Sequence, residues 1–372
     1  MKNNWPEAPL ESICRPRQWP TISFSQLTKD GYPVYGANGR IGFYKDFTHK
    51  NPTLMITCRG ATCGTLNISE PHSYITGNAM ALDDLDESAV DLKFLYYTLQ
   101  RRGLSDSITG SAQPQITRQS LEGVTIPLPP LSEQKRIAGI LDQADGLRRK
   151  RQQALALTDQ FLRSTFLDLF GDPVTNPKRW PMVRLDDVSA KVTDGEHLNP
   201  VFAPEGVPMV MAANVLSRGI SFNDLKFIAK PDHERFTKKC NPERNDLLIV
   251  SRGATIGRCT LVDTDRRFSL MGSVILVKPD RHKIIPGYLK ALFSHPGYYQ
   301  KLFTTSSASA QQAIYLSHLK EMRIPLPDIA SQKSFDVVAR TVETHIEKNE
   351  AVESASDALF NSLVQRAFRG EL

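Results

Sequence analysis

The sequence has no long hydrophobic run and few cysteines. No segment approaches the roughly 18 consecutive apolar residues of a membrane span, and the first residues lack the apolar core of a signal peptide. The five cysteines form no CxxC pair and no Cys/His cluster with the spacing of a zinc site. Cys58 and Cys63 flank one turn, so a disulfide stays an alternative there, but reduced thiols are favoured. We expect a cytoplasmic protein without a metal site.

Catalytic motifs are also missing. The sequence contains no Walker A motif, no GxGxxG after a predicted strand, no [DNS]PP[YFW] signature of amino-methyltransferases, and neither HExxH nor GxSxG. The eight histidines are scattered and form no ligand-spaced pair. We therefore predict no catalytic residue in this chain, which leaves binding as the expected activity.

The composition is typical of a soluble globular protein with room for two domains. The 372 residues are 40% hydrophobic and 23% charged, with a formal net charge of +6. Residues 1–130 carry 12 basic and 12 acidic side chains, whereas residues 173–328 carry 22 and 15. A polyanionic partner is compatible with these counts but is not required by them.

The chain contains an internal repeat. Five short segments of the first half recur in the same order in the second half, at offsets that grow from 175 to 198 residues. The second half has about 18 more residues before its RGATxG motif. Two domains of similar fold are therefore expected. The matching segments are Trp5-Pro6 with Trp180-Pro181, CRGATCG (58–64) with SRGATIG (251–257), SAQ at 111 and 309, IPLP at 126 and 324, and QK at 134 and 332.

Each half ends in a long helical pattern, in which side chains of one stripe recur every three or four residues. We predict a central helix in 131–172 and a C-terminal helix in 329–372, with Ser132 and Ser331 as N-caps. Because so long a helix cannot bury its stripe alone, the two helices are expected to form a coiled coil. Arg151 and Asn349 are then either a polar pair that fixes the register or exposed side chains. The stripes include Ile137, Ile140, Leu147 and Phe161, then Val338, Val342, Leu359 and Leu363.

The regions before the two helices, 1–130 and 173–328, indicate mixed α and β structure, so the fold class is α+β. Short β-type runs separated by turns predict strands, and two stretches predict short helices. The clearest strands are Thr53–Thr57, Asp246–Val250 and Ser273–Val277, and the helices are Leu92–Arg102 and Pro286–Leu292.

Three kinds of segment are candidates for nucleic-acid binding. The stretch 31–47 interleaves aromatic residues with Arg40, Tyr44 and Lys45; such aromatics are either core or part of a loop that faces nucleic acid. The RGATxG motifs combine arginine, a threonine hydroxyl and turn N–H groups, which suit a phosphate, or they are purely structural hairpin turns. The Gln- and Ser-rich segments near 113 and 311 either pair with adenine or cap helices. The residues of the last two kinds are Arg59, Thr62, Gln113, Gln115, Arg118, Arg252, Thr255, Arg258, Gln311, Gln312 and Tyr315.

These segments together resemble the DNA-specificity subunit of type I restriction–modification enzymes. The resemblance rests on IPLPPLSEQ (126–134) and its copy at 324–333, each leading into a long helix, and on the RGATxG turns. The segments GANGRIG (36–42) and QRAFRGEL (365–372) also contribute, so that it covers essentially the whole chain. The second copy departs from the first, with Asp-Ile-Ala-Ser at 328–331 in place of Pro-Leu-Ser-Glu at 130–133.

The resemblance implies a division of labour between this chain and its partners. Residues 1–130 and 173–328 would be target-recognition domains that each read one part of a split, asymmetric site in double-stranded DNA. The two helices would pack antiparallel as a spacer. Two copies of a DNA adenine methyltransferase subunit would dock on this scaffold, and a motor–nuclease restriction subunit would join them. S-adenosylmethionine, ATP and Mg would bind those partners, and this chain would hold no cofactor.

Three alternatives stay open at this stage. In the first alternative, the chain is the recognition subunit of a related two-component restriction system, in which one partner both cleaves and methylates. In the second, it is a self-contained nuclease or modification enzyme, which would cut or methylate DNA unaided. In the third, it is a protein scaffold without DNA contact, which would show no salt-dependent binding to duplex DNA.

Overall fold

A computed structural model describes residues 5–110, 113–198, 200–302 and 313–372. The chain divides into two compact units. Unit 1 takes the described residues up to Gln152 together with Val352–Leu372, and unit 2 takes those in Gln153–Ala351. Each of the two long helices is therefore shared between the units. Within the described ranges, no helix is both long and apolar enough to cross a membrane.

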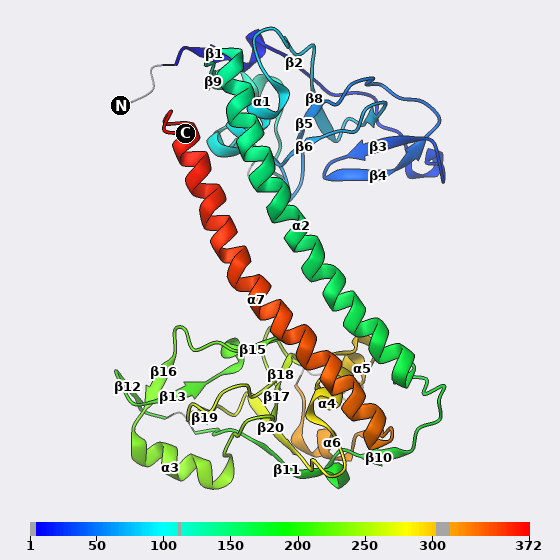
Figure 1. Ribbon diagram of the computed structural model, residues 1–372, viewed down its shortest axis with the longest axis vertical. Coiled ribbons are helices and arrows are strands. Elements are labelled where there is room, and N and C mark those ends of the chain that lie inside the picture. Colours follow the sequence, from blue (N-terminus) through cyan, green and yellow to red (C-terminus); the bar gives the residue numbers. More distant parts are fainter. Residues whose placement is uncertain (1–4, 111–112, 199, 303–312) are drawn as a thin grey trace. The chain divides into compact units, whose positions relative to one another are not determined.

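Unit 1 is built on a four-stranded antiparallel sheet in the order β2-β8-β5-β6 (Figure 1). A smaller sheet, β4-β3-β7, contains the antiparallel β3–β4 hairpin and a parallel β3–β7 pair. Helix α1 (Leu92–Arg102) packs Phe94 and Leu95 into the same core as Leu54 and Ile56 of the large sheet. The strands are β2 (Arg15–Arg17), β3 (Tyr32–Gly36), β4 (Gly39–Tyr44), β5 (Leu54–Thr57), β6 (Leu66–Ile68), β7 (Tyr74–Ile75) and β8 (Ala79–Asp83).

A two-stranded sheet joins the beginning and the end of the first half. Strand β1 (Glu7–Pro9) pairs antiparallel with β9 (Thr125–Pro127), the start of the IPLP segment. The amide of Leu128 also donates to the carbonyl of Pro6 at 2.8 Å. The first and fourth matching segments of the repeat are therefore hydrogen-bonded neighbours.

Unit 2 repeats this frame. Its large sheet has the order β11-β20-β17-β18, and β10 pairs with β21 as β1 pairs with β9. The bond from Leu128 to Pro6 has its counterpart in Leu326, whose amide donates to the Pro181 carbonyl at 2.9 Å. The sheet β12-β16-β13-β19 contains a parallel β13–β19 pair, equivalent to β3–β7. The strands are β10 (Met182–Arg184), β11 (Ser189–Asp194), β12 (Phe202–Ala203), β13 (Val207–Val210), β16 (Lys226–Ile228), β17 (Leu247–Val250), β18 (Cys259–Leu261), β19 (Ser269–Leu270), β20 (Val274–Pro279) and β21 (Arg323–Pro325).

The longer second half contains elements that unit 1 lacks among its described residues. The β14–β15 hairpin (Val215–Leu216 and Gly219–Ile220) and helix α3 (Lys230–Lys239) lie between β13 and the second RGATxG motif. They explain most of the extra length seen in the sequence. The other helices of unit 2 are α4 (Pro286–Ser294), α5 (Pro296–Lys301) and α6 (Leu316–Glu321). Among the described residues, the short 3-10 turns are η1 (Leu10–Ser12), η2 (Phe24–Gln26), η3 (Ser105–Ser107), η4 (Gln119–Leu121), η5 (Asp186–Val188) and η6 (Ala212–Asn214).

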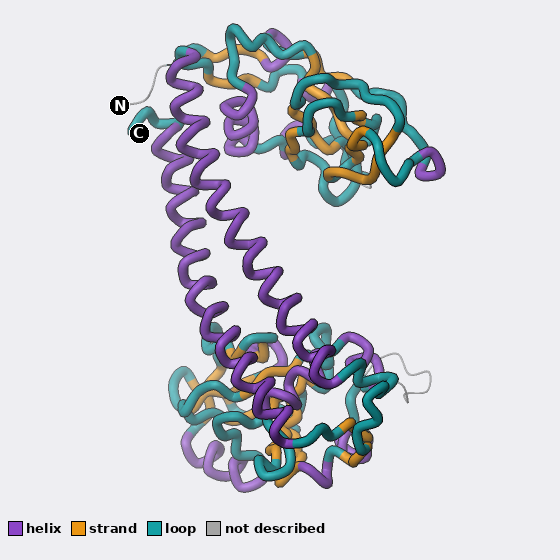
Figure 2. The backbone as a smooth tube through the Cα atoms, turned by 45° about the vertical axis from the view of Figure 1, so that its right-hand side comes forward, coloured by secondary structure: helices purple, strands orange, loops and turns teal. Residues whose placement is uncertain are grey.

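The two long helices are α2 (Leu131–Phe170) and α7 (Ile329–Ala367), which confirms both predicted helices (Figure 2). Their parts in unit 1 run antiparallel, since Arg148 lies over the Phe360 ring at 4.9 Å and Arg151, further along α2, donates to the earlier Ser356. In unit 2 the ring of Phe335 in α7 contacts Phe166 and Phe170 of α2.

Two expectations about the helix starts are corrected, and one open question about the helices is answered. Ser132 and Ser331 are not N-caps, because α2 already begins at Leu131 and α7 at Ile329. Before α7 the cap is Asp328, whose carboxylate accepts from the amide and the hydroxyl of Ser331 at 2.8 and 2.7 Å. Of the two alternatives for Arg151 and Asn349, exposure fits Asn349 in unit 2, whereas Arg151 donates to the Ser356 hydroxyl within unit 1.

The predicted stripe is only partly buried within the units. Ile137 and Val342 are buried, whereas Ile140, Val338 and Leu363 are half-buried. Leu147, Phe161 and Leu359 are 57%, 55% and 59% exposed. These three side chains lie on helix faces that their own unit leaves uncovered.

The glutamine of each repeated Gln-Lys pair is completely buried. Gln134 accepts from the amide of Asp91, the N-cap of α1, and donates to the carbonyls of Ala89 and Pro129, all at 2.9 Å. Gln332 accepts from the amide of Ile285, which precedes α4, and donates to a carbonyl before α7. We call this arrangement the glutamine clamp; it joins the start of each long helix to the start of a short one.

Candidate nucleic-acid interface

The first RGATxG motif forms a tight turn between β5 and β6. The amides of Cys63, Gly64 and Thr65 donate to the carbonyls of Gly60, Thr57 and Thr62 at 3.0, 2.9 and 3.0 Å. Gly60 and Gly64 have φ angles of +85° and +89°, which side chains other than glycine rarely adopt. The two glycines of the motif are therefore required by the backbone of the turn.

The second motif repeats this turn bond for bond between β17 and β18. The amides of Ile256, Gly257 and Arg258 donate to the carbonyls of Gly253, Val250 and Thr255 at 3.1, 2.8 and 3.1 Å. These six positions are the unit 1 positions shifted by 193 residues. The φ angles of its glycines are +96° and +80°. The motif therefore forms a hairpin turn in both units, as the structural interpretation predicts. This role accounts for the glycines of the motif but not for its arginine and threonine side chains.

The turn in unit 1 is paired with the Gln-rich segment that the sequence singled out. Arg59 forms an isolated antiparallel bridge with Gln115, and the amide of Ile116 donates to the Cys58 carbonyl at 2.9 Å. Arg59, Thr62, Gln113 and Gln115 are all exposed. The structure therefore brings four predicted residues onto one surface.

Unit 2 has the same pairing. Arg252 forms an antiparallel bridge with Ala313, and the amide of Ile314 donates to the Ser251 carbonyl at 2.9 Å. Tyr315 follows and is 54% exposed. Gln311 and Gln312, also predicted to bind DNA, lie outside the described residues.

The tip of the β3–β4 hairpin lies beside the first turn, because the Thr57 hydroxyl donates to the Ala37 carbonyl. Arg40 follows the tip and is exposed. Its Nη1 lies 3.5 Å from Oε1 of Glu70, which in turn accepts from the Tyr35 hydroxyl at 3.1 Å. Burial raises the pKa of Tyr35, so the phenol stays protonated as this donor. Sequence reasoning missed Glu70, which lies 30 residues from Arg40 and carries no motif.

The remaining predicted residues are placed less uniformly. Tyr44 is half-buried and packs edge-on against Tyr74 with ring centroids 5.6 Å apart, whereas Lys45 is exposed. Arg118 is exposed at the start of η4. Thr255 and Arg258 are half-buried, and Nη1 of Arg258 donates to the Val215 carbonyl in β14 at 3.4 Å. The stretch 31–47 is therefore part core and part surface.

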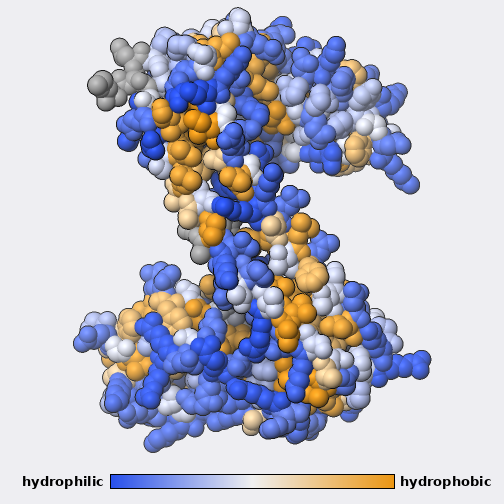
Figure 3. Space-filling model, in the orientation of Figure 1, coloured by the Kyte–Doolittle hydropathy of each residue, from blue (hydrophilic) through white to orange (hydrophobic). Residues whose placement is uncertain are grey.

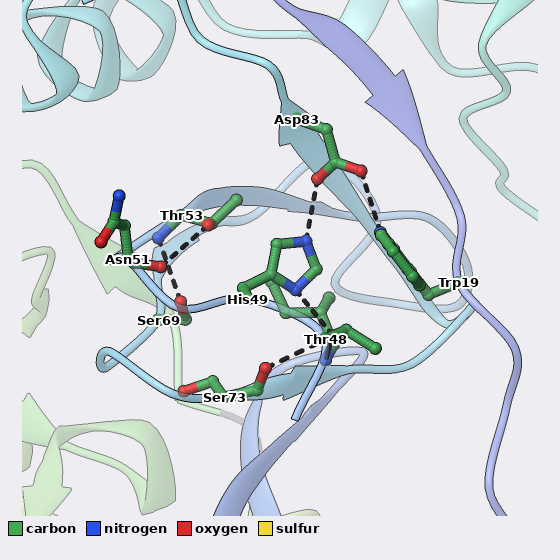
Figure 4. A network of polar contacts seen from close by, with 9 residues as sticks. Trp19, Thr48, His49, Asn51, Thr53, Ser69, Ser73 and Asp83 are labelled. Carbon is green, nitrogen blue, oxygen red and sulfur yellow. Dashed lines mark hydrogen bonds and ion pairs between the residues drawn. The ribbon is translucent and has the colours of Figure 1, made fainter. Parts of the chain in front are cut away.

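A buried polar network fastens the small sheet of unit 1 to the large one (Figure 4). Asp83 of β8 accepts from Nε1 of Trp19 at 2.9 Å, and its other oxygen lies 2.8 Å from Nε2 of His49. Nδ1 of His49 lies 2.7 Å from the Thr48 hydroxyl, which accepts from the amide of Ile75 in β7. The position of the β3–β4 hairpin relative to the large sheet depends on these contacts.

Metal-ligand side chains and thiols are both present among the described residues of these surfaces. The face over β3 and β4 is mainly hydrophilic (Figure 3). Among the described residues no three His, Cys, Asp or Glu side chains are grouped as a metal site would require. All five cysteines are free thiols, and burial raises the pKa of Cys58, next to the turn, to about 11. That thiol is not an activated nucleophile.

Comparison with known proteins agrees with this arrangement. The family model described as the type I restriction modification DNA specificity domain matches residues 2–157 and 177–354. The EcoBI type I restriction enzyme specificity subunit of Escherichia coli is 24% identical over 390 residues, which are 94% of this chain and 76% of that protein. The MjaVIII specificity subunit of Methanocaldococcus jannaschii is 23% identical over 338 residues, 85% of this chain and 79% of that protein.

The fold is shared with a solved structure. The S subunit of a type I restriction–modification system from M. genitalium matches with a TM-score of 0.68 and 17% identity, and the match covers 99% of this chain and 97% of that one. The family match extends over most of both halves, including both RGATxG turns. This chain belongs to the type I restriction–modification DNA-specificity family.

Proposed function

We propose that this chain reads a bipartite, asymmetric site in double-stranded DNA, each unit reading one part. The observation that carries the proposal is the repetition of one frame with different additions. Both units contain the same RGATxG turn, a corresponding four-stranded sheet and a corresponding two-stranded sheet that joins the start and the end of the half. In unit 1 the tip of the β3–β4 hairpin lies beside the turn. Unit 2 contains in addition the β14–β15 hairpin and helix α3. Two similar supports that present different side chains fit two unlike part-sites.

The exposed side chains have the chemistry that such reading requires. Arginine and lysine bind phosphates, arginine also pairs with guanine, and glutamine pairs with adenine through two hydrogen bonds. In unit 1 these types are present as Arg40, Lys45, Arg59 and Gln115, all exposed. We infer that the residues of the interface contact DNA in the assembled complex.

We further infer that catalysis takes place in partner subunits. Two copies of a DNA adenine methyltransferase would dock on α2 and α7, with a motor–nuclease subunit added for restriction. S-adenosylmethionine, ATP and Mg would be bound by those partners. The exposed Leu147, Phe161 and Leu359 support docking, because large apolar side chains on a helix face are suited to a protein partner.

The test is co-expression with the neighbouring methyltransferase gene, followed by sequencing that maps methylated adenines. A split asymmetric motif that disappears when this chain is deleted is the expected result. Absence of any motif, together with no salt-dependent DNA binding by the complex, would favour a scaffold without DNA contact. Methylation by this chain alone would identify a self-contained enzyme.

Docking is tested by a substitution on the uncovered helix face. Leu147→Asp should abolish co-purification of the methyltransferase, because a carboxylate would be buried in an apolar contact. Val201→Asp is the matched control, since Val201 is 83% exposed but lies in a loop of unit 2. Full co-purification with the Leu147→Asp variant would contradict docking at this face.

A further inference from the structure

We infer that the two RGATxG turns bind the sugar–phosphate backbone, one in each part-site, and that the residues that differ between the units select the bases. This inference rests on the proposed function and assigns a ligand group to one part of the interface. Its first support is the identity of the two turns. The three internal hydrogen bonds and the outer bridge to the neighbouring segment are the same in both units.

That identity limits what the turns can contact. Two unlike part-sites present different base edges, but their phosphodiester groups are chemically the same at every step. A feature preserved bond for bond in both units fits the part of the ligand that both part-sites share. A base-reading residue is expected to differ between units, as the surroundings of the turns do.

The second support is the unused binding capacity of each turn. Arg59 and Arg252 are exposed, and neither has an acidic partner within the described part of the chain. Other arginines nearby are engaged, since Arg40 lies near Glu70 and Arg258 donates to a backbone carbonyl. An unpaired guanidinium on a rigid turn is the donor that a phosphate requires.

Backbone amides add to this capacity. In unit 1 the amides of Ala61 and Thr62 bond to no carbonyl of a described residue, and in unit 2 the same holds for Ala254 and Thr255. Consecutive free N–H groups in a turn form a concave site for anions. A Cβ built on Gly60 or Gly253 would meet no atom within 4 Å, so the space over both turns is open at the same position.

Base selection is then assigned to the neighbours of the turns. Beside the first turn lies the β3–β4 tip, where Arg40 is oriented by Glu70 and Tyr35. Beside the second turn lies β14, whose Val215 carbonyl accepts from Arg258. These neighbours have different sequences and different folds, as the reading of two unlike part-sites requires.

The test measures how binding by the complex of this chain with its methyltransferase depends on salt. Complexes with Arg59→Ala, Arg252→Ala or Arg59→Lys are titrated on the mapped duplex and on a scrambled duplex over a range of salt concentrations. Each alanine variant should weaken binding to both duplexes by the same factor. The slope of log K against log salt should fall by about one per arginine removed, as for one lost phosphate contact.

The lysine variant separates a phosphate from a base. Lysine replaces arginine on a phosphate as a point charge but cannot pair with guanine through a planar fork. Arg59→Lys should therefore keep the wild-type slope and the wild-type methylated motif. Arg102→Ala is the matched control, because the Arg102 guanidinium is already paired with Asp106 at 2.7 Å, and the slope of this variant should not change.

Three results would overturn the inference. A change of the methylated motif in Arg59→Ala or Arg59→Lys would show that Arg59 reads a base. An unchanged affinity and slope in both alanine variants would make the turns purely structural. An equal fall of slope in Arg102→Ala would show that any surface charge suffices. Failure of the proposed function is distinguishable, because the wild-type complex itself would then show neither a motif nor salt-dependent binding.

Discussion

The glutamine clamp allows a prediction that can be made separately for each unit. Replacing Gln134 by alanine removes one acceptor and two donor interactions, all with backbone groups near the start of α1 and α2. Replacing Gln332 removes one acceptor and one donor interaction near the start of α4 and α7. At about 1 kcal/mol for each hydrogen bond, the free energy of unfolding should fall by ~3 kcal/mol in Gln134→Ala and by ~2 kcal/mol in Gln332→Ala. The fall is larger if a backbone carbonyl or amide stays buried without a partner.

The assay is hydrogen exchange followed by mass spectrometry on the full chain. Gln134→Ala should speed exchange in α1 and in the first turns of α2, and leave α4 at the wild-type rate. Gln332→Ala should show the reverse pattern. Gln134→Glu is a nearly isosteric control, and it should destabilise unit 1 at least as much, because a carboxylate cannot donate to the Ala89 and Pro129 carbonyls.

Two results would contradict the claim that each buried glutamine stabilises the helix starts of its own unit. One is a Gln134→Ala protein whose free energy of unfolding lies within about 0.5 kcal/mol of wild type, the range of an ordinary surface substitution. The other is faster exchange in α4 equal to that in α1. Either result would mean that packing, and not these hydrogen bonds, holds the helix starts.

Three further predictions follow from other buried or capped groups. His49→Ala should destabilise unit 1 by about 3 kcal/mol in denaturant unfolding, because Asp83 would be left buried with only the Trp19 bond, and a loss below 1 kcal/mol would contradict this reasoning. Cys58 should react with iodoacetamide at pH 8 about a hundredfold more slowly than a thiol of the ordinary pKa of 9.0, because its own pKa is about 11; equal labelling with a small-peptide thiol would refute it. Hydrogen bonds from Ser331 lower the pKa of Asp328 below 3.8. The first turn of α7 should therefore be fully protected from hydrogen exchange above pH 3.8, and this protection should fall as the pH drops through the lowered pKa. The Asp328→Ala variant should show no such pH dependence.

Much of the fold could be predicted because the repeat and the periodicity are local signals. Helix α1 has the bounds predicted from the sequence, Leu92–Arg102. Both long helices begin two residues after an IPLP segment ends, at Leu131 and Ile329, where the predicted helical regions also begin. The turn at each RGATxG motif followed from its glycines. The strands of the large sheets came from runs of apolar residues such as 247–250.

The parts that could not be predicted depend on contacts between distant residues. Trp19, His49 and Asp83 lie at least 30 residues apart, and none belongs to a repeated segment. The same is true of Glu70, which orients Arg40. The error at the N-cap of α7 had another cause, since serine and aspartate are equally good caps and only the observed start of the helix decides between them.

The roles of the repeated segments explain why they are repeated. The β1–β9 and β10–β21 pairs close each half, the buried glutamines join the long helices to the short ones, and the RGATxG turns connect strands of the large sheets. The strand pairs and the turns are held by backbone–backbone hydrogen bonds, and the two glutamine side chains also bond to backbone groups, so none of these contacts involves the side chains presented beside the turns. The tip of the β3–β4 hairpin in unit 1 and the β14–β15 hairpin and α3 in unit 2 are attached to this frame and differ between the units. A frame held by backbone contacts can therefore keep its fold while its attached elements change, and this is the property that a subunit reading two unlike DNA sequences requires.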